Sequence, residues 1–294
     1  KPEKEDWYGW LFPDFKSGLD AIHECHRGDC MPTVTRLNDP KKTALSFAFK
    51  HPKTGIKDKI AKAFKWYIGN VKKIDFNQCC LMVVKYEGTP QAFNRIKNRV
   101  TAIYKKHRGV CLGAEPGRSF AKVKFDFPHL RDYVMDRSIM ADVSETATTW
   151  DNLRTLHESG LADVEQAIKD TGVDAWVGCH LSHSYRTGAS LYFTFGCLQR
   201  EGREIEQYLY VKKAAEDAFM KNGGTLSHHH AVGTEHLPWV EEDLSPTGLK
   251  AVKALKAGLD PNDIMNPGKI IPSEKPLDDW GLSAEAIDEF QSRS

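Results

Sequence analysis

The chain has 294 residues, 40% of them hydrophobic, so it can bury a core and divide into two lobes. Its 41 basic side chains balance 40 acidic ones, so the chain has no long-range electrostatic field that would attract nucleic acid or an anionic membrane. No apolar run approaches the roughly 20 residues of a membrane helix, and seven irregularly spaced cysteines favour a reducing compartment over a secreted disulfide framework.

The first half of the chain alternates strand and helix patterns. WLFPDF predicts a strand, residues 15–26 a helix, and PTVTRL a second strand. The apolar run CLMVVKYEG, a helix from Pro90 to about His107 and the return strand GVCLG form another such unit. Tandem β-α-β units predict an α+β fold, a ferredoxin-like antiparallel sheet backed by helices.

The second half supplies further strands and ends in a helical segment. Residues 125–150 predict a short helix and a long strand, VMDRSIMADVSETA, and residues 150–170 a helix. The strands DAWVGCHLSHSY and ASLYFTFGC follow, and apolar spacing over 204–221 predicts an amphipathic helix. A helix over 246–257 comes last, before an acidic, Pro-containing stretch that is expected to be an exposed tail.

Three consecutive histidines, His228, His229 and His230, follow an Asn-Gly-Gly turn at the end of the helix over 204–221. Imidazole changes charge near neutral pH, so a tight group of histidines can transfer protons or bind phosphate or metal. The alternative is an expression tag or a metal-binding surface loop, but tags lie at termini and this run lies inside the chain. The triplet is therefore a candidate functional site.

A tyrosine and two arginines are further candidates. In GASLYFTF, strand alternation places Tyr192 opposite Leu191 and Phe193, so its hydroxyl can face a cavity, although a strand tyrosine is more often half-buried packing. Arg36 in PTVTRL and Arg131 in PHLRDY suit phosphate or carboxylate, and each alone also suits a surface ion pair.

Other motifs carry less information. HECHRGDC superficially resembles a zinc site, but Cys25 and His26 are adjacent on a helix end and no second ligand pair follows at a usual spacing. His180 and His183 form a poor chelate, because a strand directs side chains at that spacing apart. The sequence has no G-x-S-x-G elbow, Walker loop or G-x-G-x-x-G after a strand, which weakens hydrolase, nucleotidase and Rossmann dehydrogenase hypotheses.

Several segments resemble FAD-linked oxidases of the vanillyl-alcohol oxidase type and occur in the same order: FPDFKSGLDAI, PTVTRL, LRDYVMDRSIMADVSETATTWDNL, TGASLYFTF, NGGTLSHHHAVG and LDPNDIMNPGKII. Within that group the histidine triplet most resembles the alkyldihydroxyacetonephosphate synthase family. The resemblance implies a substrate-binding cap domain over 1–222, a C-terminal segment over 223–272 that returns to the flavin domain, and a tail over 273–294. The N-terminal FAD-binding domain is expected to lie outside this chain.

The resemblance also implies an activity, the exchange of the acyl chain of acyl-dihydroxyacetone phosphate for a fatty alcohol. FAD is the implied cofactor. Tyr192 is implied as the proton-transfer residue, and Arg131 and Arg36 as partners of the anionic groups. The triplet 228–230 is implied to hydrogen-bond the phosphate and assist proton transfer, and Asn266 in NPGK to contact the flavin.

Relatives that dehydrogenate D-2-hydroxy acids hold a metal with two histidines and a glutamate. In this chain Tyr192 takes the place of the second histidine and His229 that of the glutamate, so no metal is predicted. An FAD-linked oxidase or dehydrogenase of a D-2-hydroxy acid or another alcohol remains the alternative. A non-enzymatic lobe whose histidines bind zinc or a partner is a third hypothesis.

The expected partner is a small lipid phosphate, with no nucleic acid. The resemblance is compatible with a homodimer and with peripheral membrane contact. The expected compartment is the cytoplasm if the chain is bacterial and the peroxisome if it is eukaryotic, although QSRS does not match an S-K-L ending.

Overall fold

The computed structural model describes residues 1–48, 55–125 and 127–292. The chain divides into two compact units, which are described separately. Unit 1 comprises Lys1–Leu130 and Gly178–Ala189, and unit 2 comprises Arg131–Val177 and Ser190–Ser294. The domain limits at 222 and 272 concern the family's domains and stay a prediction.

Unit 1 contains a sheet with the strand order β4-β1-β3-β2-β6. Its elements are β1 (Lys4–Phe12), α1 (Phe15–Arg27), β2 (Val34–Asn38), α2 (Pro40–Ala48), α3 (Ile56–Trp66), the π-helix η1 (Tyr67–Val71), β3 (Cys80–Gly88), α4 (Pro90–Lys106), β4 (Val110–Gly113), α5 (Glu115–Val123) and, from the following half of the chain, β6 (Trp176–Ser184). The pairings of β1 with β3 and β4, and of β2 with β3 and β6, are antiparallel. The connectivity β1-α1-β2-β3-α4-β4 is ferredoxin-like, which confirms the predicted fold class.

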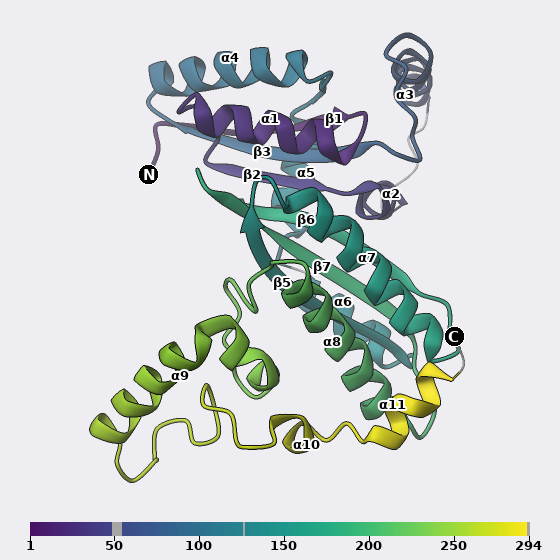
Figure 1. Cartoon of the computed structure of the whole chain (residues 1–294). Coiled ribbons are helices and arrows are strands. Elements are labelled where there is room, and N and C mark those ends of the chain that lie inside the picture. The colour runs from purple at the N-terminus through teal and green to yellow at the C-terminus, as the bar shows by residue number, and fades with distance from the viewer. Residues whose placement is uncertain (49–54, 126, 293–294) are drawn as a thin grey trace. The chain divides into compact units, whose positions relative to one another are not determined.

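The helix α1 begins at a side-chain cap and packs on the sheet of unit 1. Asp14 accepts a hydrogen bond from the Ser17 N–H at 2.7 Å and begins α1. α1 and α4 lie on one face of the sheet (Figure 1). The core includes Trp10 and Phe12 of β1, whose rings meet Tyr104 edge-on at centroid distances of 5.2 and 5.4 Å.

Unit 2 pairs β5 with β7 and packs two long helices on them. Its elements are the end of α6 (Phe127–Met135), β5 (Ile139–Thr149), α7 (Leu153–Asp170), β7 (Gly188–Leu198), α8 (Glu204–Lys221), the 3₁₀ helix η2 (Leu237–Trp239), α9 (Val240–Leu259), α10 (Pro276–Trp280) and α11 (Ala284–Gln291). α7 and α8 run side by side (Figure 1). Gly160 admits the Phe193 ring, since a Cβ there would lie 2.8 Å from it.

Two segments differ from the sequence-based expectation. α9 begins at Val240 rather than Pro246, and its helical geometry breaks at Ser245 (φ 67°), because a residue before proline avoids the helical region. The stretch after residue 272 is not simply exposed, because α11 buries Ala286 and Phe290. Phe290 packs on Tyr210 of α8 with ring centroids 5.0 Å apart. The acidic composition suggested a solvated tail, whereas apolar residues at i and i+4 give α11 one buried face.

In the described part of the chain, no helix is both long and apolar enough to cross a membrane. The cysteines at 25, 30, 79, 80, 111, 179 and 197 are all free, and only Cys111 is exposed.

Candidate functional site

The histidine loop begins where α8 ends, and its turn sequence is required there. Gly223 has a φ of +70°, a conformation that favours glycine. A Cβ on Gly224 would lie 2.4 Å from Thr146 Oγ1 of β5. The Thr225 N–H donates to the Ala147 carbonyl at 2.9 Å, and the Thr146 hydroxyl donates to the Thr225 carbonyl at 2.7 Å. β5 therefore fixes the loop immediately before the histidines.

The end of β5 and Asn152 after it secure the same turn. The Asn152 side-chain amide donates to the Asn222 carbonyl at 2.6 Å, and the Thr148 hydroxyl donates to the Gly223 carbonyl at 2.8 Å. These contacts satisfy carbonyl groups at the end of α8, where intrahelical partners run out.

Glu145 of β5 joins two members of the triplet. Its buried carboxylate accepts the His229 main-chain N–H at 2.9 Å, and its Oε1 lies 2.9 Å from His229 Nδ1 and 3.4 Å from His228 Nδ1. The two Nδ1 atoms lie 2.8 Å apart, so one of them donates to the other. Burial opposes ionisation of Glu145, but hydrogen bonds from His229 outweigh it and hold the pKa of this carboxyl below its usual value. Glu145 is therefore an anion at neutral pH.

Tyr192 lies against the third histidine. Along β7 the side chains of Leu191, Phe193 and Phe195 are buried, while Tyr192 between them is half-buried. Its ring meets the His230 ring edge-on, with centroids 5.5 Å apart. The structure thus brings Tyr192 to His230 in the same unit that joins Glu145 to the other two imidazoles. The chemical roles of these residues stay predictions.

The two arginines lie in different units. Arg131 of α6 is largely exposed, and its guanidinium lies 4.0 Å from the Asp142 carboxylate of β5. Arg36 of β2 belongs to unit 1, where its Nε donates to Asn38 Oδ1 at 3.4 Å and its guanidinium lies 5.3 Å from the centre of the Phe120 ring. Their predicted contacts with anionic substrate groups stay predictions.

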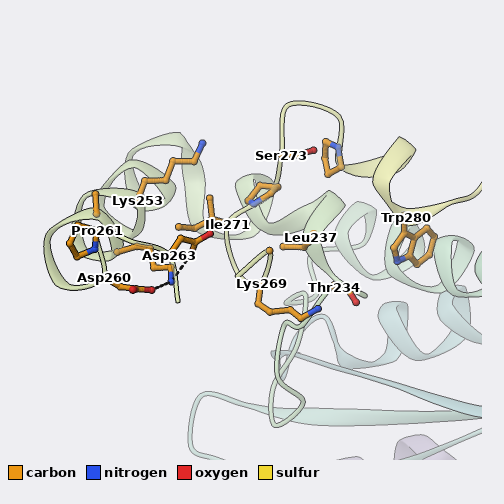
Figure 2. A pocket seen from close by; sticks show the side chains of 15 residues that line it. Thr234, Leu237, Lys253, Asp260, Pro261, Asp263, Lys269, Ile271, Ser273 and Trp280 are labelled. Carbon is orange, nitrogen blue, oxygen red and sulfur yellow. Dashed lines mark hydrogen bonds and ion pairs between the residues drawn. The ribbon is translucent and has the colours of Figure 1, made fainter. Parts of the chain in front are cut away.

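Asn266 lies in the loop after α9, with a φ of +50° and its carbonyl 3.3 Å from the Lys269 N–H. Lys256 holds this loop by ion pairs with Asp260 and, at 2.8 Å, with Asp263. A pocket of about 620 Å³ opens here (Figure 2). Its lining includes Lys253, Asp260, Lys269, Ile271 and Trp280. Neither Asn266 nor the triplet lines it, so the predicted flavin contact of Asn266 stays a prediction.

An ionic network surrounds Lys212 of α8, whose side chain is 2% exposed. Its ammonium donates to the Val143 carbonyl at 2.8 Å and the Ser144 hydroxyl at 2.7 Å, and it pairs with Asp142 at 3.3 Å and Glu235 at 2.6 Å. Burial acts to lower the pKa of Lys212, but the charges of the two acids outweigh it and raise that pKa. Lys212 therefore links α8 to β5 and to the segment that follows the triplet.

Glu216, one turn further along α8, provides a pH test of this network. The side chain is 0% exposed, and burial raises its pKa to about 8 against the partial opposition of Lys212. Because its pKa is higher folded than unfolded, ionisation destabilises the protein increasingly between about pH 4.5 and pH 8. We expect Glu216→Gln, which stays neutral, to gain stability over the parent across this range, by a few kcal/mol at about 1.4 kcal/mol per pKa unit.

Urea unfolding at intervals from pH 5 to pH 8 measures this difference. Glu201→Gln, at an exposed position before α8, is the matched control and should show no such trend. A stability difference for Glu216→Gln that stays constant with pH would contradict the assigned pKa.

Glu145 was not predicted as a site residue, and it changes the metal question. Among the described residues, Glu145, His228 and His229 are the group of three that could hold a metal ion, with ligand atoms within 4.8 Å of one another. Their separations of 2.8 to 3.4 Å are near the roughly 3.3 Å edge of a zinc tetrahedron with bonds of about 2.0 Å. The prediction of no metal rests on the two replaced ligand positions, Tyr192 and His229, and does not include the Glu145 carboxylate. One sequence signal was available, a glutamate within the strand SETATT, where glutamate is disfavoured.

Comparisons with known proteins agree in the family they indicate. The model of the family "FAD linked oxidases, C-terminal domain" matches residues 1–270. The alkyldihydroxyacetonephosphate synthase of Dictyostelium discoideum is 35% identical over 274 residues, which are 93% of this chain and 45% of the relative. The Trypanosoma brucei brucei protein of the same name is 35% identical over 272 residues, 92% of this chain and 44% of the relative.

Solved structures give the same result. A crystal structure of an alkyldihydroxyacetonephosphate synthase superposes with a TM-score of 0.72 at 32% identity, covering 90% of this chain and 45% of that one. A 4-ethylphenol oxidase from Gulosibacter chungangensis has a TM-score of 0.57 at 12% identity, over 94% of this chain and 55% of that one, and shows the fold alone. The chain spans about half the length of the synthases it matches.

Proposed function

This chain belongs to the FAD-linked oxidase family through its C-terminal domain, and on that premise we propose that it forms the substrate-binding half of an enzyme that exchanges the acyl chain of acyl-dihydroxyacetone phosphate for a fatty alcohol. The printed names of its relatives support the substrate class. The observation that carries the proposal is the arrangement of Tyr192 on His230 beside the imidazoles held by Glu145.

FAD is the cofactor of this family. When bound, FAD supplies a redox-active and electrophilic isoalloxazine ring. The donor set on this chain fits that chemistry, because a half-buried phenol and a group of imidazoles can hold and move protons beside the ring. The chain's contribution is therefore proton transfer, phosphate binding and substrate orientation.

Two steps are assigned to the site. Tyr192 acts as a phenolate: it passes its hydroxyl proton to the neighbouring His230 imidazole, takes the proton from the reacting carbon of dihydroxyacetone phosphate, and later returns it. The imidazoles of His228 and His229, whose Nδ1 atoms lie 2.8 Å apart beside the Glu145 carboxylate, are assigned to hydrogen bonds with the phosphate. The roles of Arg36 and Arg131 in binding the phosphate and the leaving carboxylate stay predictions.

An exchange assay on a protein that joins this chain to its flavin domain tests the proposal. With acyl-dihydroxyacetone phosphate and isotope-labelled hexadecanol, we expect a labelled ether product and released fatty acid in equal amounts. D-2-hydroxy acids should leave the flavin spectrum unchanged. Bleaching by a hydroxy acid together with no ether product would refute the exchange and favour an oxidase or dehydrogenase.

One observation favours that second function. Glu145 supplies a carboxylate beside two imidazoles, a ligand set with which a bound cation could polarise a substrate hydroxyl. Our proposal predicts that overnight dialysis against a zinc chelator leaves the exchange rate unchanged and that metal analysis finds substoichiometric zinc. One equivalent of zinc that is lost in Glu145→Gln, with activity lost on chelation, would instead establish the metal-dependent oxidation.

The homodimer, the peripheral membrane contact and the compartment, cytoplasmic or peroxisomal, stay predictions.

A further inference from the structure

Exposed lysines and aromatic rings lie together on α3 and η1 of unit 1, and the proposed function does not use them. Residues 59–74 include five lysines and neither an acidic residue nor an arginine, although the whole chain is nearly neutral. All five are exposed: Lys59, Lys62, Lys65, Lys72 and Lys73. The exposed hydrophobic side chains between them are Phe64, Trp66, Tyr67 and Val71, of which Trp66 is the most exposed at 62%. We refer to these side chains as the α3 surface.

A separate set of side chains holds this segment to the core of unit 1. Ile68 of η1 and Ile74 just after it are buried in a hydrophobic cluster with Leu11 of β1 and Val110 of β4. α3 itself stands apart from α1 and α4, the helices on the sheet (Figure 1). The two isoleucines therefore anchor the segment, while the α3 surface stays accessible to solvent.

The exposed rings pack on one another and beside the lysine ammonium groups. Phe64 and Tyr67 stack with ring centroids 6.4 Å apart and planes inclined by 21°, as neighbours three positions apart on a helix can. Lys72 Nζ lies 5.7 Å from the centre of the Tyr67 ring, and Lys65 Nζ lies 5.2 Å from that of Phe76. Positive charge and hydrophobic area therefore share one surface.

We infer that the α3 surface docks on the headgroup region of an anionic phospholipid membrane. Tryptophan and tyrosine favour the boundary between headgroups and acyl chains, and lysines beside them attract anionic headgroups. Lysine supplies all of the charge here, whereas protein interfaces are depleted in lysine and nucleic-acid sites favour arginine. The attraction acts within a Debye length of about 10 Å, so the near-zero net charge of the chain does not prevent it. The inference does not depend on the proposed function.

Co-sedimentation of the whole chain with sucrose-loaded vesicles tests this docking. We expect vesicles of phosphatidylcholine with about 30% phosphatidylserine to bind at least about tenfold more tightly than phosphatidylcholine alone. Raising NaCl from about 0.1 M to about 0.5 M should weaken the binding, because the Debye length shortens. Equal binding to the two kinds of vesicle, or binding to neither, would overturn the inference.

Trp66→Ser tests the hydrophobic part of the α3 surface. It should weaken binding to the anionic vesicles by about tenfold, because the largest inserting side chain is lost. Leu259→Ser, at a still more exposed position in unit 2, is the control and should change binding less than about twofold. Equal losses for both variants would contradict docking through α3.

A double variant tests the charged part and does not alter the packing of any ring in the core. Lys72→Gln combined with Lys73→Gln should weaken binding by about tenfold or more, at about fivefold for each lysine. Lys105→Gln combined with Lys122→Gln removes the same charge from exposed positions elsewhere in unit 1 and should have less than about a twofold effect. Circular dichroism checks that each variant folds, and the lysine pair decides the matter if Trp66→Ser does not. Equal losses for the two lysine pairs would overturn the inference.

Vesicle binding by a protein that joins this chain to its flavin domain distinguishes a membrane surface from a surface between domains. We expect the joined protein to keep the preference for anionic vesicles and the loss in Trp66→Ser. Loss of vesicle binding on joining would show that the other domain covers the α3 surface, and would overturn the inference. Vesicle binding needs no substrate, so a negative exchange assay would count against the proposed function alone.

Discussion

Tyr192→Phe is expected to lower the rate of alkyl exchange by about 10²- to 10⁴-fold, the range associated with loss of a general acid–base group. The substitution removes one hydroxyl from a half-buried ring and keeps the contact with His230, so folding and substrate affinity should change little. The loss should therefore appear in kcat, with KM nearly constant. Steady-state kinetics on the flavin-containing protein measure both parameters.

A matched variant separates the phenol's chemistry from a general effect of losing a hydroxyl. Tyr133→Phe alters an exposed ring on α6 and should leave kcat unchanged. If Tyr192→Phe retained full activity, the proton-transfer role would have to pass to another group, and His230, whose ring contacts that of Tyr192, would be a candidate.

Lys212→Met is expected to lower the free energy of unfolding by about 3–5 kcal/mol, the range seen when one partner of a buried ion pair is removed. Without the ammonium, Asp142 loses its contact at 3.3 Å and Glu235 its contact at 2.6 Å. Methionine fills the space of the lysine stem but cannot bind these carboxylates or the Ser144 hydroxyl. Urea denaturation at pH 7 measures the change.

The adjacent lysine is the control. Lys213 pairs with Asp217 on the more accessible side of α8, so Lys213→Met should cost less than about 1 kcal/mol. Similar losses for both variants would show that the buried network contributes little. Because Glu235 lies five residues after His230, Lys212→Met should also weaken whatever the triplet binds.

The sequence predicted most of the sheet and the long helices because their signals are local. CLMVVKYEG coincides with β3, and the apolar spacing over 204–221 coincides with α8. The helix α2 was not predicted, since its lysines and few apolar residues give no clear helical periodicity. The burial of residues 284–291 depends on packing against α8, which is far away in the sequence, so composition alone could not predict it.

The site was predictable only in part, for a related reason. The triplet and Tyr192 stand out by residue type within short motifs. Glu145 owes its role to histidines more than eighty residues later in the chain. Lys212 resembles an ordinary solvent-facing helix lysine in VKKAAED, and only packing shows that it is buried. Local patterns therefore identify the candidate catalytic residues. The residues that hold them in position, such as Glu145 and Lys212, can be identified only from the tertiary structure.

β5 carries Ser144 and Glu145 next to each other, the first bonded to Lys212 and the second to the histidine loop. Neighbouring strand residues point to opposite sides. A register shift of β5 by one residue would therefore turn the Glu145 carboxylate toward α8 and the Ser144 hydroxyl toward the imidazoles. Single-residue insertions or deletions in this strand should therefore disrupt both the Ser144–Lys212 hydrogen bond and the bonds between Glu145 and the histidine loop. During divergence of the family, length changes are expected to accumulate in the connecting loops and to spare this strand.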